Sequence, residues 1–323
     1  MKPQSKIEET PDITVHPLQE TELAAADTIM RLAFGTFIGL PDPMAFMGDA
    51  AYVRTRWLAN PQNAFTAEVA GEVVGSNFAT NWGSVGFFGP LTVRPDFWDR
   101  GVAKRLMEPI MDLFEKWQTT HAGLFTFPHS IKHVGLYRRF GFWPRFLTAL
   151  MSRQVEPVKS SAQWTRFSEV PANEQDAILS MCREVTDAIY EGLDVAHEIR
   201  AVAAQNLGDT ILLSDDGRLV AFAVCHVGPG TEAGSGVCYV KFGAVRPGTA
   251  AEEHFNRLID ACEEMASTRQ VARLVAGVNT ARHEAYRQML ARGFRTDMQG
   301  VVMSRPNEAG YNRPDVYLID DWR

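Results

Sequence analysis

The strongest constraint on the fold is a repeat within the chain. Val93-Arg94-Pro95 recurs as Val245-Arg246-Pro247, and Gly141-Phe142 recurs as Gly293-Phe294, each 152 residues further along the 323-residue chain. Because two landmarks keep the same spacing in both halves, the repeat indicates an internal duplication. A chain of this length also exceeds the usual size of one hydrophobic core, which favours two domains. We expect a flexible leader at 1–11, a first domain at 12–155, a linker at 156–163 and a second domain at 164–323.

The order of the predicted elements sets the fold class of both halves. In the first half, apolar patterning predicts strands at 13–18, 64–70, 73–80, 84–93, 123–127 and 145–155, and helices at 20–34, up to about 58, at 102–117 and at 131–139. The second half partly repeats this order, with helices at 171–188, 195–207, 252–266 and 280–292 and strands at 210–214, 218–227, 236–245 and 273–278. Each half is therefore expected to be an α/β (α+β) domain, a mixed and mostly antiparallel sheet with helices on both faces.

One stretch of the first half, 91–106, joins a strand to a helix through a turn. The apolar strand ends at Val93, and from Val102 the apolar residues follow helical spacing, with Gly101 at the start of the helix. Unpaired backbone N–H groups and the positive end of the helix dipole suit an anion there, and a pyrophosphate fits best. An ordinary βα turn is the alternative for this stretch taken alone. Positive charge around the turn comes from Arg94, Arg100, Lys104 and Arg105.

Composition narrows the class of protein. Hydrophobic residues make up 46% of the chain and charged residues 22%, which is ordinary for a globular protein. The net charge of −7 argues against a nucleic-acid partner and mildly favours cationic substrates. Without a secretory signal or an apolar run long enough to cross a membrane, we expect a cytoplasmic protein that binds no membrane. The four cysteines, all in the second half and without a CxxC pair, are expected to be reduced buried thiols, with no metal bound.

Two motifs of the first half resemble the GCN5-related N-acetyltransferase (GNAT) superfamily, here as two tandem domains. In that family a strand ending in Val-x-Pro leads to a phosphate loop of the pattern Arg/Gln-x-x-Gly-x-Gly/Ala, and then to a helix. Here the loop is 98–103, in which Trp98 departs from the usual Arg or Gln. The second family signature, Asn-x-x-Ala-x-x-Leu-Tyr followed by Gly-Phe, corresponds to 130–142, where Ser130 and His133 replace Asn and Ala.

The resemblance implies acetyl-CoA as co-substrate and assigns roles to residues. The pantetheine arm would run along the strand 88–93, pairing with backbone near Leu91 and Val93, and the pyrophosphate would bind the N–H groups of 100–104. Tyr137 would be the general acid that protonates the departing thiolate, with a half-buried packing role as the alternative. The expected cofactor-binding residues are Leu91, Thr92, Val93, Trp98, Asp99, Arg100, Gly101, Val102, Ala103, Lys104 and Ser130.

The second copy lacks these features. At the repeat spacing, the loop residues 100–103 become 252–255, Glu-Glu-His-Phe, which place two carboxylates where an anion would bind. Tyr137 becomes Met289, which cannot donate a proton. We therefore expect catalysis in the first half only, with a degenerate second half that supports or shapes the acceptor site.

The sequence predicts an acetyl-CoA-dependent N-acetyltransferase that acts on a small-molecule or peptide amine. The alternatives are transfer of a longer acyl group or transfer to a hydroxyl, and a non-catalytic CoA-binding or sensor protein. The acceptor is expected between the two halves, near the apolar loop 34–43 and the C-terminal run 314–323.

No general base stands out in the sequence. Glu68, Glu72 and Asp96 lie near the right strands, and His129 and His133 flank the motif helix. Each of these side chains fits a surface or capping role better than that of a base.

Overall fold

The computed structural model describes residues 12–156 and 164–323. The expected leader 1–11 and the linker residues 157–163 lie outside the described residues. None of the described helices has the length and hydrophobicity that crossing a lipid bilayer requires.

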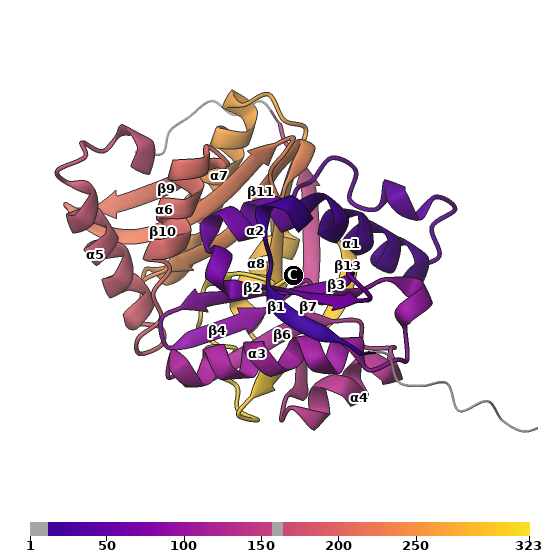
Figure 1. The fold of residues 1–323 in the computed structure, drawn as a ribbon. Coiled ribbons are helices and arrows are strands. Elements are labelled where there is room, and N and C mark those ends of the chain that lie inside the picture. The colour runs from indigo at the N-terminus through magenta and orange to yellow at the C-terminus, as the bar shows by residue number, and fades with distance from the viewer. Residues whose placement is uncertain (1–11, 157–163) are drawn as a thin grey trace, which may run out of the picture.

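The first half alternates strands and helices much as its apolar patterning predicts (Figure 1). Its elements are β1 (Thr14–Pro17), η1 (Glu20–Glu22), α1 (Leu23–Phe37), η2 (Pro43–Ala45), α2 (Val53–Ala59), η3 (Pro61–Asn63), β2 (Ala64–Val69), β3 (Glu72–Trp82), β4 (Val85–Phe88), β5 (Thr92–Val93), η4 (Pro95–Phe97), α3 (Val102–Lys116), β6 (His121–Thr126), α4 (Ile131–Arg139) and β7 (Trp143–Gln154), where η marks a short 3₁₀ turn.

The second half follows the same plan. Its elements are β8 (Thr165–Arg166), η5 (Phe167–Glu169), α5 (Gln175–Asp187), α6 (Ala196–Gln205), β9 (Gly208–Asp215), β10 (Arg218–Gly228), β11 (Gly234–Val245), α7 (Ala251–Thr268), β12 (Arg273–Asn279), α8 (His283–Ala291), β13 (Arg295–Arg305) and β14 (Leu318–Ile319). The starts of β6, α4 and β7 each lie 152 residues before those of β12, α8 and β13, so the duplication read from the sequence extends to the elements themselves.

All of these strands belong to one 14-stranded sheet, ordered β1-β2-β3-β4-β6-β13-β7-β12-β11-β10-β9-β8, with β5 on β3 and β14 on β11. The expectation that the strand 145–155 completes the sheet of the first half is wrong. β7 pairs antiparallel with β12 of the second half, and β13 takes the place beside β6. β7 and β13 also pair with each other, so the two halves exchange their last strands and share a seam of main-chain hydrogen bonds.

Helices cover both faces of the first-half strands. α1 and α2 lie on one face, and α3 and α4 lie on the other (Figure 1). α3 turns an apolar stripe to the sheet, because Val102, Leu106 and Ile110 are spaced four residues apart and are all buried. The mixed sheet with helices on both faces confirms the predicted fold class.

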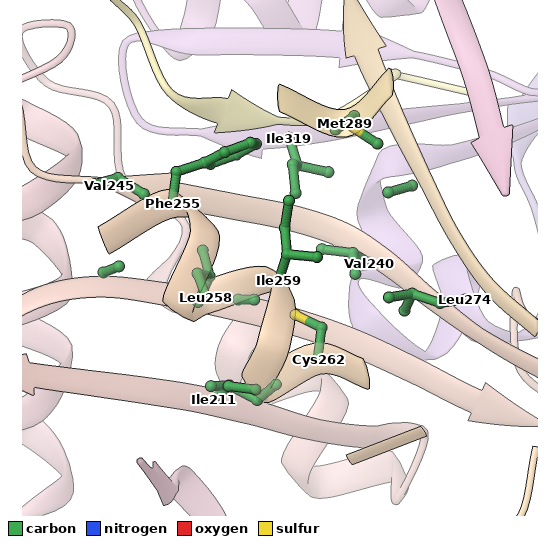
Figure 2. Close-up of a cluster of buried hydrophobic side chains, with 14 of the residues drawn as sticks. Ile211, Val240, Val245, Phe255, Leu258, Ile259, Cys262, Leu274, Met289 and Ile319 are labelled. Carbon is green, nitrogen blue, oxygen red and sulfur yellow. The ribbon is translucent and has the colours of Figure 1, made fainter. Parts of the chain in front are cut away.

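The second half has a core of its own, built around α7. Figure 2 shows the inner face of this helix packed against side chains of the neighbouring strands. The contacting residues are Phe255, Leu258, Ile259 and Cys262 of α7, with Ile211, Val240, Val245, Leu274, Met289 and Ile319 around them. All four cysteines are buried free thiols, as predicted.

The strand predicted at 84–93 is interrupted, and the interruption opens the sheet. Gly89 and Pro90 separate β4 from β5, and proline brings no N–H to a ladder. β4 runs parallel to β6 as far as the pair Phe87 and Gly123. β5 instead pairs with β3, so the sheet parts between β5 and β6.

The core around α7 supports a stability prediction. Leu258 is fully buried, so Leu258→Ala is expected to lower the free energy of unfolding by about 2–5 kcal/mol through lost burial and a residual cavity. Leu290→Ala on α8, where the side chain is 38% exposed, is the control and should change it by much less. Urea denaturation measures both, and equal losses for the two variants would contradict the assignment of α7 to the core.

Candidate active site

A cavity of about 780 Å³ lies in the opening between β4–β5 and β6. Its walls come from α1, the α1–α2 loop, the start of α3, α4 and the last two residues of the chain. The lining includes these residues expected from the sequence: Leu91, Thr92, Val93, Trp98, Asp99, Gly101, Val102, Ala103, Lys104, Ser130 and Tyr137. Arg100 is the exception, because its guanidinium lies over the Phe97 ring, 5.2 Å from the centroid, and it does not line the cavity.

The start of α3 forms a potential anion site at one end of the cavity. Gly101 is the N-cap of the helix with φ of 86°, a left-handed conformation that glycine adopts without strain. No side chain caps this end, and the first helical bond runs from the Arg105 N–H to the Gly101 carbonyl at 3.2 Å. The N–H groups ahead of Arg105 therefore stay available to an anion, as the sequence predicts.

Part of the positive charge expected around this turn is already paired. Arg94 contacts Glu72 at 3.1 Å and Asp96 at 2.8 Å. Arg105 contacts Glu108 at 2.9 Å. Lys104 forms no ion pair with any described residue, so it is the cation of this loop that lines the cavity and is free to bind a phosphate.

The departure from the family pattern at Trp98 has a local explanation. The indole N–H donates a hydrogen bond of 2.7 Å to the Val93 carbonyl and closes the turn between strand and helix. This carbonyl therefore points away from β3. In an antiparallel ladder the N–H and C=O of one residue point to the same side, so the Val93 N–H also faces the opening.

Tyr137 lies in the wall of the cavity on α4. Ser130 caps this helix by accepting a hydrogen bond of 3.3 Å from the His133 N–H. The Tyr137 ring packs edge-on against Phe88, with centroids 5.6 Å apart. Burial raises the pKa of the phenol, so the hydroxyl keeps its proton at neutral pH, and it bonds to no described residue.

Aromatic side chains form the other end of the cavity. Phe34 stacks on Phe46 with centroids 5.1 Å apart, and Phe37 lies 4.9 Å from Phe127 and 4.8 Å from the ring of His133. The sequence places the end of the first helix at 34, but α1 continues to Phe37. Helical Gly35 permits this packing, because a Cβ there would lie 2.3 Å from the Pro43 carbonyl oxygen.

At the equivalent place in the second half, the chain fills its own groove. Gly243 and Ala244 of β11 pair with Ile319 and Leu318 of β14, and the Val245 N–H donates to the Tyr317 carbonyl at 3.1 Å. These three β11 residues correspond, at the repeat spacing of 152, to 91–93 in the first half. In the second half, the C-terminal segment therefore occupies the edge equivalent to the one that the resemblance assigns to pantetheine in the first half.

The same segment then continues into the cavity of the first half. Trp322 stacks on Phe87 with an interplanar angle of 5° and centroids 6.0 Å apart. Gly123 of β6 makes room for it, since a Cβ there would lie 1.9 Å from the indole. Trp322 and Arg323 both line the cavity, which agrees with the expectation that the run 314–323 approaches this region.

A buried cluster of charges joins the second half to the break between β4 and β5. Arg56 of α2 contacts Glu232 at 2.9 and 3.1 Å, donates to the Gly89 carbonyl at 2.5 Å, and also donates to the Arg323 carbonyl. Lys241 of β11 lies 2.9 Å from both Glu232 and Glu198. Burial alone would raise the pKa of Glu232, but Arg56 and Lys241 outweigh it and hold this pKa below its usual value.

The loop between β10 and β11 also holds the α1–α2 loop of the first half. The Ser235 N–H and hydroxyl donate to the Asp49 carboxylate at 2.8 and 2.5 Å, and the Ala51 N–H donates to the Thr231 carbonyl at 2.9 Å. Within the first half, Arg31 donates to the Phe46, Gly48 and Ala50 carbonyls. The aromatic end of the cavity is thus fixed from both halves.

Comparison with known proteins finds a family match in the first half of the chain. Residues 29–142 match the family described as the acetyltransferase (GNAT) family. This match lies within the first half of the chain. The resemblance read from 98–103 and 130–142 is confirmed. No curated protein sequence matches the chain significantly.

Solved structures show the same fold over both halves. A presumed acetyltransferase of Pyrococcus horikoshii is 12% identical, with 96% of this chain and 95% of that chain covered and a TM-score of 0.68. A GCN5-related N-acetyltransferase of Sphaerobacter thermophilus is 14% identical, with 91% of this chain and 96% of that chain covered and a TM-score of 0.60. A tandem GNAT protein from the clavulanic acid biosynthesis pathway is 12% identical, with 91% of this chain and 98% of that chain covered and a TM-score of 0.56. The tandem arrangement is therefore that of known GNAT proteins, and at these identities the likeness shows the fold alone.

The buried charge cluster predicts a loss of stability in acid. His226 of β10 is fully buried beside it, and its Nε2 has no hydrogen-bond partner among the described residues. Burial, aided by the charge of Lys241, lowers the pKa of His226 from 6.5 to about 4. The unfolded chain thus binds this proton first, so stability is complete above pH ~6.5 and falls by up to about 3 kcal/mol as the pH drops toward 4.

Urea denaturation at pH 7 and pH 4.5 measures this loss. His226→Asn is expected to reduce the difference in stability between the two pH values, because it removes the group that titrates. His197→Gln replaces an exposed histidine and serves as the control. An unchanged pH dependence in His226→Asn would show that other groups cause the acid loss.

Proposed function

We propose that this protein is an acetyl-CoA-dependent N-acetyltransferase that reacts in the cavity of its first half, with a small-molecule or peptide amine as acceptor. The observation that carries the proposal is the opening between β4–β5 and β6, which joins an uncapped helix start at one end to Tyr137 and an apolar end. A cavity of about 780 Å³ that connects these groups has room for a pantetheine arm and for a small acceptor.

The residues present fit coenzyme A. The backbone N–H groups from Gly101 to Lys104 and the Lys104 ammonium would hold the pyrophosphate. Backbone groups of Leu91 and Val93 would pair with the pantetheine amides. Bound acetyl-CoA supplies a thioester as acyl donor.

Two groups of this chain would then act on the reacting atoms. The Val93 N–H faces the opening and would donate a hydrogen bond to the thioester oxygen, where negative charge develops during attack by the amine. Tyr137 would donate the proton of its hydroxyl to the sulfur as the carbon–sulfur bond breaks, and the proton lost by the attacking nitrogen would restore the phenol. Its raised pKa ensures that this proton is present throughout the neutral range.

Binding of the co-substrate is tested by copying the second half into the first. Gly101→Glu installs the residue found at the equivalent position, Glu253, and places a carboxylate where the pyrophosphate would bind. Acetyl-CoA should raise the melting temperature of the wild type but not that of this variant. Gly217→Glu, in an exposed turn with φ of 76°, imposes similar backbone strain away from the cavity and should keep the full shift. A full shift in Gly101→Glu would contradict the proposed phosphate site.

Turnover tests the role of Tyr137. Tyr137→Phe is expected to lower kcat by about 10²–10⁴-fold with little change in the KM for acetyl-CoA, because the ring stays and the proton donor is lost. Tyr286→Phe, on the equivalent helix α8, is the control and should retain the wild-type kcat. Thiol release measures both.

The alkaline side of the pH–rate profile gives a second readout. Since burial raises the pKa of Tyr137, ionisation of this group should cause no fall in kcat below pH ~10. Unchanged turnover in Tyr137→Phe would exclude Tyr137 as proton donor. Binding of acetyl-CoA without thiol release would favour a sensor over an enzyme.

A further inference from the structure

We propose that the acceptor is a singly charged primary amine with an apolar body, aromatic or branched, which binds among the aromatic side chains below α1. This inference rests on the proposed function and names the substrate class of the same cavity. It narrows the expectation drawn from the net charge of −7, which mildly favours cationic substrates, to a single ammonium group on an apolar body.

The cavity has two chemically different ends on opposite faces of the sheet. The start of α3 lies on the face covered by α3 and α4, whereas α1 and α2 cover the opposite face (Figure 1). With coenzyme A held at the first end, an acceptor reaches the thioester from the second. The lining residues of that second end are mostly apolar: Met30, Phe34, Phe37, Ile38, Phe46 and Met47.

Charge is distributed unequally between the two ends. Asp99 has the sole acidic side chain among the described residues that line the cavity, and it lies at the phosphate end, paired with Lys132 at 2.7 Å. At the apolar end the charged lining side chain is the guanidinium of Arg323. Glu232 and Asp321 do not line the cavity, and both are engaged by cations. A second ammonium group on the acceptor would be buried without a counter-ion, which is unfavourable.

The apolar surroundings also favour the reactive form of a monoamine. Attack on a thioester needs the neutral amine, and desolvation lowers the pKa of an ammonium group. An acceptor bound among Phe34, Phe37 and Phe46 is therefore shifted toward its free base without a dedicated carboxylate. Burial also lowers the pKa of His133, so this neutral imidazole of the cavity wall repels no ammonium.

The apolar end is rigidly built, which a specificity pocket requires. Arg31 fixes the backbone of 46–50 through three carbonyls, and Asp49 is anchored to Ser235 of the second half. Phe46 is therefore held against Phe34.

A matched pair of amines tests the substrate class. With acetyl-CoA at a fixed concentration, thiol release is measured for 2-phenylethylamine and for 1,4-diaminobutane. The kcat/KM for 2-phenylethylamine is expected to be at least about tenfold higher, the usual discrimination of an apolar pocket. Equal values, or a preference for the diamine, would overturn the inference.

Two variants test whether the apolar end of the cavity causes the preference for 2-phenylethylamine. Phe37→Ala should lower kcat/KM for 2-phenylethylamine by about tenfold or more and leave the KM for acetyl-CoA unchanged, because the ring lines the acceptor end. Leu58→Ala on α2, where the side chain is 42% exposed and outside the cavity, is the control and should leave both constants unchanged. No change in Phe37→Ala would overturn the assignment.

Further measurements distinguish a failure of this inference from a failure of the proposed function. If the apolar end holds a long acyl chain instead, the wild type will prefer octanoyl-CoA to acetyl-CoA and Phe37→Ala will raise the KM for octanoyl-CoA, which overturns the inference. Calorimetric titration of 2-phenylethylamine into the protein with coenzyme A reports binding without turnover, and absence of binding also overturns it. A missing thermal shift with acetyl-CoA contradicts the proposed function itself, so the two failures are distinguishable.

Discussion

The exchange of β7 and β13 is the constraint on which the rest of the structure depends. β7 of the first half pairs with β12 of the second half, and β13 of the second half pairs with β6 of the first half. β7 and β13 also pair with each other in the middle of the sheet. An edge strand left alone would expose a row of unpaired N–H and C=O groups. The seam satisfies these groups for both halves at once. It also holds the second half against the cavity of the first, so residues of both halves line this cavity.

The two copies place different groups at equivalent positions. In the first half the opening beside β5 is a cavity that ends in free helix N–H groups. In the second half the corresponding edge of β11 is occupied by β14, and the Tyr317 hydroxyl donates to Glu252 in the first turn of α7. The segment that fills the second groove then reaches the first cavity through Trp322. Of the two equivalent grooves, the one in the first half is open. The one in the second half is filled by the C-terminal segment, which also contributes to the wall of the first cavity.

Sequence patterns foresaw the parts of the site that depend on local chemistry. Gly101 indicates the start of a helix and Tyr137 a position on a short helix, because these features depend on neighbours within a few residues. The side chain of Arg100 lies over the Phe97 ring, a position that the sequence pattern did not predict. β13 was missed, although the repeat spacing places its first residue 152 after that of β7.

The sequence by itself determined the duplication, the resemblance of the first half to GNAT domains, the mixed sheet with helices on both faces, and the absence of the 98–103 loop pattern from the second half. Only the tertiary structure decided which strand completes which half, where the C-terminal segment lies, and which side chains form the apolar end of the cavity. Arg56 and Glu232 are separated by 176 positions, and no local pattern pairs them. Local patterns depend on short-range geometry, whereas the pairing of distant segments is settled by packing and by the need to satisfy buried charges and strand edges.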